Sequence, residues 1–168
     1  MLTRVSLTLI SLLSSMGAFA QTPTGSCSLD ITRSVALGLD HALEDARDLP
    51  DYGFLTDGRE TIYVSSYLWE NDCVVDDSVL PETSDQNFVL MSQQDLTELA
   101  ARRRSDIVHV DAGDVRILGG EIRLWVRVAI QPYADSGLGL ECCCGGEMVF
   151  RRNDVGWEFA EWAVTVCA

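Results

Sequence analysis

His109 and Asp111 are the two residues of this sequence best suited to acid–base chemistry. They stand two positions apart in a run of β-forming residues, so their side chains share one face of an extended strand. A nearby carboxylate can orient an imidazole or raise its pKa, which makes the pair a candidate for acid–base catalysis. This role requires a pocket, into which Arg123 or Trp125 could also project. On an outward face the pair would be ordinary surface residues, and the spacing alone favours that interpretation.

No other part of the sequence predicts a catalytic, metal or cofactor site. His41 lies among acidic residues of a helical pattern and is expected to face solvent. The acidic residues around Cys73 lack the spacing of a calcium-binding EF-hand. The sequence also has no glycine-rich phosphate loop, nucleophile elbow or His-Glu-x-x-His motif. We therefore expect no metal and no cofactor.

The first twenty residues have the features of a cleavable export signal. Arg4 supplies a positive charge, residues 5–13 form an apolar run, and Ala18-Phe19-Ala20 is a small-x-small cleavage motif. The apolar run is shorter than the roughly 20 residues that span a bilayer. We expect a signal peptide at 1–20 and one soluble domain at 21–168, secreted or periplasmic. After cleavage we expect no membrane insertion.

Six cysteines in an exported chain predict structural disulfides. They are Cys27, Cys73, Cys142, Cys143, Cys144 and Cys167. Adjacent cysteines on a strand point alternately to opposite faces, so the run at 142–144 does not converge on one metal ion. A strained, redox-active bridge between neighbours is the alternative.

The N-terminal part of the domain predicts a helix followed by a strand. Residues 29–49 carry apolar side chains at three- and four-residue steps, with Asp30 as the N-cap and Pro50 directly after the helix. Residues 61–67 are rich in β-forming side chains and follow the turn pair Asp57-Gly58. We expect a short hairpin or a turn that leads into one strand.

The middle of the chain predicts a loop, a strand and a second helix. Residues 70–86 are acidic and aperiodic, which indicates a surface loop. A brief strand at 88–91 leads to Ser92, which begins a capping-box-like motif with Asp95. The helix is expected to continue to about Arg104.

The C-terminal part predicts an antiparallel β-meander. Its four strand-like runs are Ile107–Leu118, Glu121–Ile130, Cys144–Arg152 and Trp157–Cys167. The second run alternates strictly between apolar and more polar residues, which indicates one buried face. In the first run the apolar residues change from even to odd positions around Gly113, and this change predicts a β-bulge there.

The last hairpin has a predicted register. With the turn at 153–156, Arg151 faces Glu158 and Phe150 faces Phe159, so opposite charges and aromatic rings meet. The same register places Cys142 opposite Cys167, and a one-residue change in the turn would place Cys143 there instead. We expect Cys167 to bond to one of these two. Cys27 and Cys73 would then bond to each other or to the two remaining cysteines.

Two helical segments before a curved meander that ends in Val155-Gly156-Trp157-Glu158-Phe159 resemble the NTF2-like superfamily. This is the cystatin-like α+β roll of SnoaL-like polyketide cyclases and ketosteroid isomerases. The similarity covers most of residues 21–168 in element order. It implies an α+β fold with two helices packed on a curved antiparallel meander of four or more strands, around a conical pocket. The cysteines depart from the cytosolic enzymes of this group and suggest an exported branch.

The functions in that superfamily include isomerases, cyclases and pure binding proteins, so the fold does not decide the function. The formal net charge of −14 argues against a nucleic-acid partner. We predict a non-catalytic module, stabilised by two or three disulfides, that binds a small molecule or an exported protein. The alternative is a small isomerase- or cyclase-like enzyme with His109 or Asp111 as general base. A third possibility is an inhibitor whose acidic surface binds a basic partner. No oligomeric state is predicted.

Overall fold

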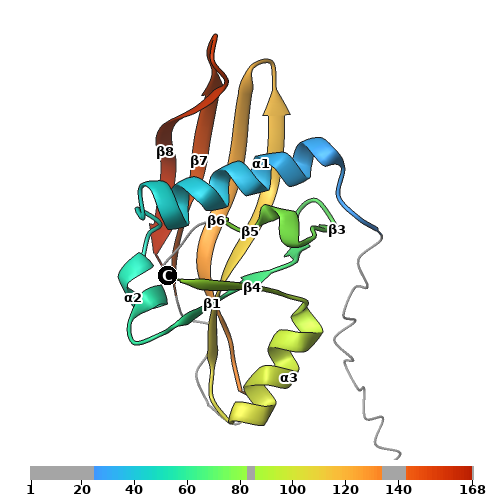
Figure 1. Cartoon of the computed structure of the whole chain (residues 1–168), viewed down its shortest axis with the longest axis vertical. Coiled ribbons are helices and arrows are strands. Elements are labelled where there is room, and N and C mark those ends of the chain that lie inside the picture. Colours follow the sequence, from blue (N-terminus) through green and yellow to red (C-terminus); the bar gives the residue numbers. More distant parts are fainter. Residues whose placement is uncertain (1–24, 83–85, 134–142, 168) are drawn as a thin grey trace, which may run out of the picture.

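The computed structural model describes residues 25–82, 86–133 and 143–167. Within these ranges the chain forms a mixed six-stranded sheet, a separate two-stranded sheet and three α-helices (Figure 1). The predicted signal peptide at 1–20 lies outside the described residues. None of the helices in these ranges is long and apolar enough to cross a membrane.

The large sheet has the strand order β4-β1-β5-β6-β7-β8. Its strands are β1 (Thr61–Ser65), β4 (Asn87–Met91), β5 (Ile107–Leu118), β6 (Glu121–Gln131), β7 (Cys144–Arg152) and β8 (Trp157–Cys167). The small sheet pairs β2 (Tyr67–Leu68) with β3 (Cys73–Val74). The helices are α1 (Leu29–Asp40), α2 (Tyr52–Thr56) and α3 (Gln93–Arg103), with a π-helical turn at His41–Asp45 and a 3-10 turn at Asp77–Val79. The α+β class is therefore confirmed.

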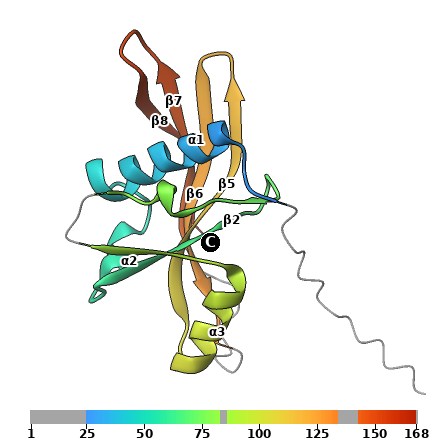
Figure 2. The same cartoon turned by 45° about the vertical axis from the view of Figure 1, so that its right-hand side comes forward.

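The helices α1 and α3 lie on opposite faces of the sheet. Val108 and Val110 of β5 share the main core with α1, whereas Ile107 packs with Leu96 and Ala100 of α3. Neighbouring residues of a strand point to opposite faces, so these two contacts define two sides. In both cartoon views α1 crosses the strands of the meander, and α3 lies at the end of the molecule where β5 begins (Figures 1 and 2). The sheet thus has one face covered by α1 and a second face only partly covered by α3.

The expected purely antiparallel sheet is wrong, because β1 runs parallel to both of its neighbours, β4 and β5. The segment from β4 through α3 to β5 is a strand–helix–strand crossover, which returns the chain in its original direction. β1 lies between these two parallel strands. The mixed sheet and its strand count therefore differ from the predicted meander with two helices.

The first helix begins where the sequence predicts but ends earlier. Its N-cap is Ser28 rather than Asp30, because the Ser28 hydroxyl accepts the backbone N–H of Ile31 at 3.4 Å. Asp30 lies in the first turn, where a carboxylate complements the positive end of the helix dipole. The α-helix stops at Asp40, and the π-helical turn then changes the direction of the following side chains. The second predicted helix is confirmed, including its Ser92 cap.

The structure decides one prediction in the middle of the chain and corrects another. Of the two alternatives for the residues before β1, the turn that leads into one strand is found, preceded by the short helix α2 and not by a hairpin arm. The acidic segment 70–86 is not a surface loop throughout, because Cys73, Val75 and Val79 are buried in the main core. The disulfide Cys27–Cys73 attaches this segment to the residues just before α1. Acidic residues flank these buried residues in the sequence, so the segment has no apolar periodicity that would predict its burial.

The four C-terminal strands are confirmed, and so is the bulge in the first of them. The register between β5 and β6 shifts between Gly113 and Arg116. On β6, the alternating residues Ile122, Leu124, Val126 and Val128 are all buried in the core under α1. The positions of the apolar residues therefore predicted both the buried face of β6 and the position of the bulge in β5.

The predicted pairs Arg151–Glu158 and Phe150–Phe159 are confirmed in the last hairpin. The predicted cysteine partner is wrong, because Cys167 bonds to Cys144 and not to Cys142 or Cys143. Two register shifts each place an extra residue on β8, and together they move the pairing by two positions. Cys143 is also disulfide-bonded, and Cys142 lies outside the described residues. Disulfides of this kind indicate a non-cytoplasmic environment.

Removal of the two disulfides is expected to destabilise the domain to different extents. Replacing Cys27 and Cys73 by serine should lower the free energy of unfolding by about 4 kcal/mol, because the bond closes a sequence separation of 46 residues. The same change at Cys144 and Cys167, 23 residues apart, should cost about 0.6 kcal/mol less. Urea unfolding of both double variants checks this order, and a larger loss at Cys144–Cys167 would contradict the loop-entropy argument.

Close contact between α1 and the sheet depends on Gly38. A Cβ atom at this position would lie 2.0 Å from Leu124 Cδ2, and Leu124 is fully buried on β6. The glycine therefore allows the helix backbone to approach the sheet more closely than a larger residue would.

The substitution Gly38→Ala is expected to lower the free energy of unfolding by about 2 kcal/mol, although alanine usually stabilises a helix relative to glycine by up to about 1 kcal/mol. Overpacking against Leu124 outweighs the helix propensity. Gly53→Ala in α2 is the matched control, since a Cβ there meets nothing within 4 Å. Thermal and urea unfolding should show loss of stability for the first variant only. Equal stability of the two variants would show that the helix can move away without cost.

Candidate ligand-binding site

The structure brings the predicted pair His109 and Asp111 into direct contact on β5. His109 Nε2 lies 3.1 Å from Asp111 Oδ1, and the other ring nitrogen lies 3.3 Å from the carbonyl oxygen of Ile107. Both side chains point to the sheet face away from α1, because the alternate residues Val108 and Val110 face the helix. Only 3 % of His109 is exposed. A substrate would have to displace covering side chains to reach the ring.

Arg127 is the third member of this group, and the sequence analysis did not include it. It is directly opposite Asp111 in the register between β5 and β6, and its guanidinium donates to Asp111 Oδ2 at 3.0 and 3.3 Å. The guanidinium also lies 5.5 Å from the ring centroid of Trp69. The indole of Trp69 covers Gly113, where a Cβ would lie 2.4 Å from its Nε1. Arg127 and Trp69 thus lie over this part of the sheet.

Arg123, which was expected near His109, belongs to a different group of charges. It donates to Glu121 at 2.6 Å and to Glu147 at 2.8 Å. Trp125 is half-buried and pairs with Gly113 in the register, so it lies one row further along the sheet than Arg127. The register between β5 and β6 determines which side chains lie beside His109 and Asp111. This register depends on the bulge between Gly113 and Arg116.

The electrostatics of the His109–Asp111–Arg127 group favour an ionised carboxylate. Burial alone would raise the pKa of Asp111, but the hydrogen bond and charge of His109, followed by those of Arg127, outweigh it and hold the pKa below its ordinary value. An ionised Asp111 stabilises the fold at pH values above the unfolded-state pKa of about 3.9. This contribution is lost as the pH falls through the lower pKa of the folded state.

The substitution Asp111→Asn is expected to lower the free energy of unfolding at pH 7 by about 2 kcal/mol, because it removes the charge-assisted hydrogen bonds that the buried carboxylate makes with His109 and Arg127. Below about pH 3.9 the difference from the wild type should shrink, because the carboxylate of the unfolded wild type is then protonated while that of the folded state, with its lower pKa, is still ionised. Asp114→Asn is the control, because Asp114 is an exposed partner of Arg116 and should contribute less than about 1 kcal/mol. Urea unfolding at pH 7 and at about pH 3 tests this, and a pH-independent deficit would contradict it.

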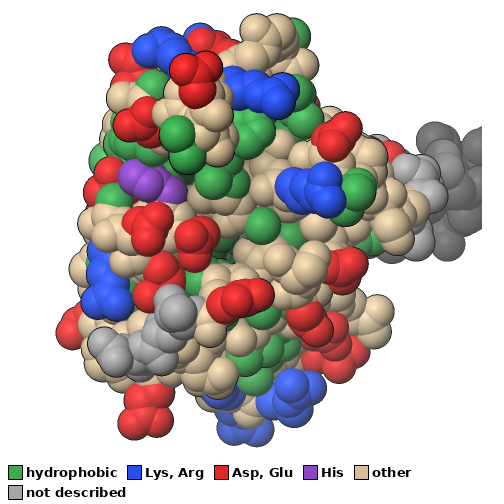
Figure 3. All heavy atoms as spheres, turned by 45° about the horizontal axis from the view of Figure 1, so that its top comes forward, with side chains coloured by type: hydrophobic (Ala, Val, Ile, Leu, Met, Phe, Trp, Pro, Cys, Tyr) green, Lys and Arg blue, Asp and Glu red, His purple; other side chains and the backbone are tan. Residues whose placement is uncertain are grey.

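His41 is not the solvent-facing residue that the sequence predicts. Its ring stacks on Phe159 at a centroid distance of 3.9 Å, and its side chain is 17 % exposed. Its Nε2 lies 3.9 Å from Asp48, which also accepts the indole N–H of Trp162 at 2.9 Å. The π-helical turn begins at His41 and rotates it toward β8, which a regular helical pattern does not predict. In Figure 3 a histidine side chain reaches the surface between hydrophobic and acidic side chains.

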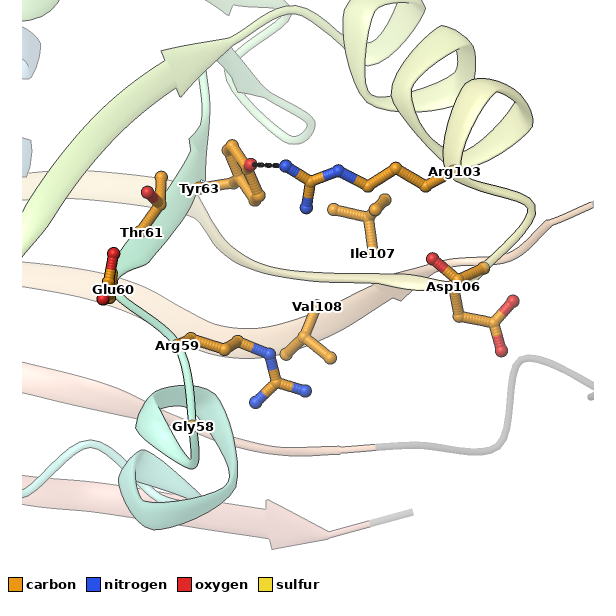
Figure 4. A pocket seen from close by; sticks show the side chains of 10 residues that line it. Gly58, Arg59, Glu60, Thr61, Tyr63, Arg103, Asp106, Ile107 and Val108 are labelled. Carbon is orange, nitrogen blue, oxygen red and sulfur yellow. Dashed lines mark hydrogen bonds between the residues drawn. The ribbon is translucent and has the colours of Figure 1, made fainter.

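A pocket of about 470 Å³ lies where β1 and β5 begin. The ladder between these parallel strands covers only Tyr63–His109 and Val64–Val110, so the preceding residues of the two strands are not paired with one another. The pocket is lined by Gly58, Arg59, Glu60, Thr61, Tyr63, Arg103, Ser105, Asp106, Ile107 and Val108 (Figure 4). Its volume is within the range of small-molecule sites. His109 and Asp111 are not among the lining residues.

Polar groups form most of the pocket lining. Ile107 and Val108 are buried and contribute a smaller apolar part. Arg103 donates to the Tyr63 hydroxyl at 2.9 Å, and Arg59 donates to the carbonyl oxygens of Phe54 and Leu55 at the end of α2. In Figure 4 the two arginines approach from different elements, with Ile107 and Val108 between them. This arrangement can hold a small molecule by both hydrogen bonds and apolar contact.

Among the residues that the structure describes, no group of three or more His, Cys, Asp or Glu side chains is arranged to hold a metal ion. No family model, curated protein or solved structure matches this chain. The NTF2-like resemblance accordingly stays a prediction from the order of elements and the strand pattern.

Proposed function

We propose that this chain is an exported, non-catalytic binding domain that holds a small organic molecule in the pocket between β1 and β5. The observation that carries the proposal is the pocket itself, with a volume of about 470 Å³, several hydrogen-bonding side chains and a smaller apolar part. Concave sites with a few convergent polar groups are where proteins usually bind small molecules. The pocket lies where β1 and β5 begin, and these strands are held together by their parallel ladder.

The position of the pocket differs from the one implied by the NTF2-like resemblance. That resemblance implies a cone between the helix and the sheet. Here Val35 and Leu39 of α1 are buried in one core with Leu124 and Val126 of β6, and Gly38 brings the backbones close. These apolar contacts favour a structural role for that interior. We therefore place the binding site at the ends of β1 and β5 instead.

Binding without catalysis is favoured by the side chains that line the pocket. They include no histidine and no cysteine. Asp106 accepts the backbone N–H of Tyr133 at 2.8 Å, and its carboxylate points away from Arg103 in Figure 4. The alternative of an isomerase- or cyclase-like enzyme needs His109 or Asp111 to reach a substrate, and a general base must lie within hydrogen-bonding distance of the proton it removes. Both side chains are buried and neither lines the pocket, which speaks against this alternative.

Export is supported by two independent features. The disulfides Cys27–Cys73 and Cys144–Cys167 suit an oxidising compartment. The sequence at 1–20 has the charge, apolar run and cleavage motif of a signal peptide. We propose that the domain works in the periplasm or outside the cell, where a stable scaffold can bind a diffusible ligand.

The proposal is tested by an NMR screen of the oxidised domain against a library of small organic fragments. Fragments that bind should shift the backbone signals of Gly58, Thr61 and Ser105, which line the pocket. Ser105→Phe should abolish these shifts by filling the pocket. Thr97→Phe is the matched control, since Thr97 is exposed on the nearby helix α3 and does not line the pocket. Fragment shifts confined to other surfaces, or unchanged in Ser105→Phe, would contradict the proposal.

A further inference from the structure

The hydrogen-bond donors of the pocket indicate the chemical class of its ligand. We infer that the pocket binds the oxyanion of a small organic acid, a carboxylate or a phosphate monoester, whose apolar part contacts Ile107. This inference rests on the proposed function of the pocket. It adds the requirement that the ligand carries a negative charge.

Arg103 and Tyr63 form one side of the proposed anion site. One terminal nitrogen of Arg103 donates to the Tyr63 hydroxyl oxygen, so the O–H of the tyrosine remains available to donate to a ligand. The guanidinium lies 5.6 Å from the centroid of the Tyr63 ring, a contact that keeps the side chain beside the pocket. The remaining N–H groups of the guanidinium can form the paired hydrogen bonds that carboxylates and phosphates accept.

Arg59 forms the other side of the site. Its Nη1 donates to carbonyl oxygens at the end of α2, which fixes the side chain in place. The guanidinium has N–H donors and no acceptor, so its other nitrogens can donate hydrogen bonds to an anion. Within the described ranges, neither Arg59 nor Arg103 forms an ion pair with a carboxylate, although acidic residues outnumber basic ones 26 to 12 in the chain. Both positive charges are therefore available to a ligand.

The two acidic residues that line the pocket do not neutralise these arginines. Asp106 is held by the backbone N–H of Tyr133 and points away from Arg103 (Figure 4). Glu60 is exposed to solvent. The hydroxyl groups of Thr61 and Ser105 are further possible donors at the rim. Hydrogen-bond donors thus dominate the polar surface that faces the pocket.

The net charge of −14 does not prevent anion binding at this site. At physiological ionic strength, charges more than about 8 Å away are largely screened. Interactions within a few ångströms therefore decide the affinity, and these come from the two guanidinium groups and the Tyr63 hydroxyl. Charge-assisted hydrogen bonds of this type are about twice as strong as neutral ones.

The test compares molecules of the same shape and different charge by calorimetry and NMR on the oxidised domain. The probes are benzoate, its neutral counterpart benzamide, and phenyl phosphate. Each is titrated into the wild type, Arg103→Gln and Arg102→Gln. Arg102 is the matched control, because it is an exposed neighbour on α3 that pairs with Glu98 and does not line the pocket. The two arginine variants lose the same charge.

We expect benzoate or phenyl phosphate to bind at least about tenfold more tightly than benzamide. Arg103→Gln should weaken that binding by about tenfold or more, and Arg102→Gln should change it by less than about twofold. A preference for benzoate identifies a carboxylate ligand, and a preference for phenyl phosphate identifies a phosphate monoester.

The inference is overturned if benzamide binds in the pocket as tightly as the two anions, or if both arginine variants behave alike. In either case fragments that bind at Gly58 and Ser105 would still support the pocket as a ligand site. If no probe and no fragment shifts the pocket signals, the inference and the proposed function both fail. Thermal unfolding of each variant shows that the fold is retained.

Discussion

Only two residues of β1 pair with β5, and the rest of the molecule depends on this short parallel ladder. On one side of it lie β4 and β1, and on the other lies the antiparallel meander from β5 to β8. The crossover through α3 requires β4 and β5 to run in the same direction, so β1 fits between them as a parallel strand. Because the ladder starts only at Tyr63, the strands separate before it. The pocket occupies that separation.

The two faces of β5 have different tasks. One face supplies the core under α1, and Gly38 and Leu124 set the distance between that helix and the sheet. The other face carries the buried side chains of His109 and Asp111, and the exposed guanidinium of Arg127 reaches the Asp111 carboxylate, with contacts of 3.0 to 3.3 Å within the group. A buried carboxylate needs such partners, because an unpaired charge in this position would strongly destabilise the fold. The group that resembles a catalytic pair in the sequence is thus explained by the demands of burial.

Much of the fold could be predicted from the sequence because the signals are local. The Ser92 cap, the alternation on β6, the bulge at Gly113 and the Arg151–Glu158 pair each depend on residues close together in the chain. The errors arose where contacts between residues far apart in the chain determine the structure. The Cys144–Cys167 bond depends on two bulges of β8 that break no apolar pattern. The parallel position of β1 is likewise set by a crossover and not by its own residues.

The candidate site was less accessible to sequence analysis. Its residues come from three separate segments, around Arg59, Arg103 and Ile107, and no motif connects them. His109 and Asp111 were correctly placed side by side, but periodicity alone did not tell which sheet face a helix would cover. The residue that completes their group, Arg127, is a neighbour only through the register of β5 with β6.

The most direct measurement of the central claim is the side-chain Nε NMR signal of each arginine during titration of the oxidised domain with benzoate and phenyl phosphate. We expect the Arg59 and Arg103 signals to shift together and reach saturation, while the signal of Arg102 remains in place. Small shifts of similar size at all arginines would show only non-specific ion binding. That result would contradict a ligand site between β1 and β5.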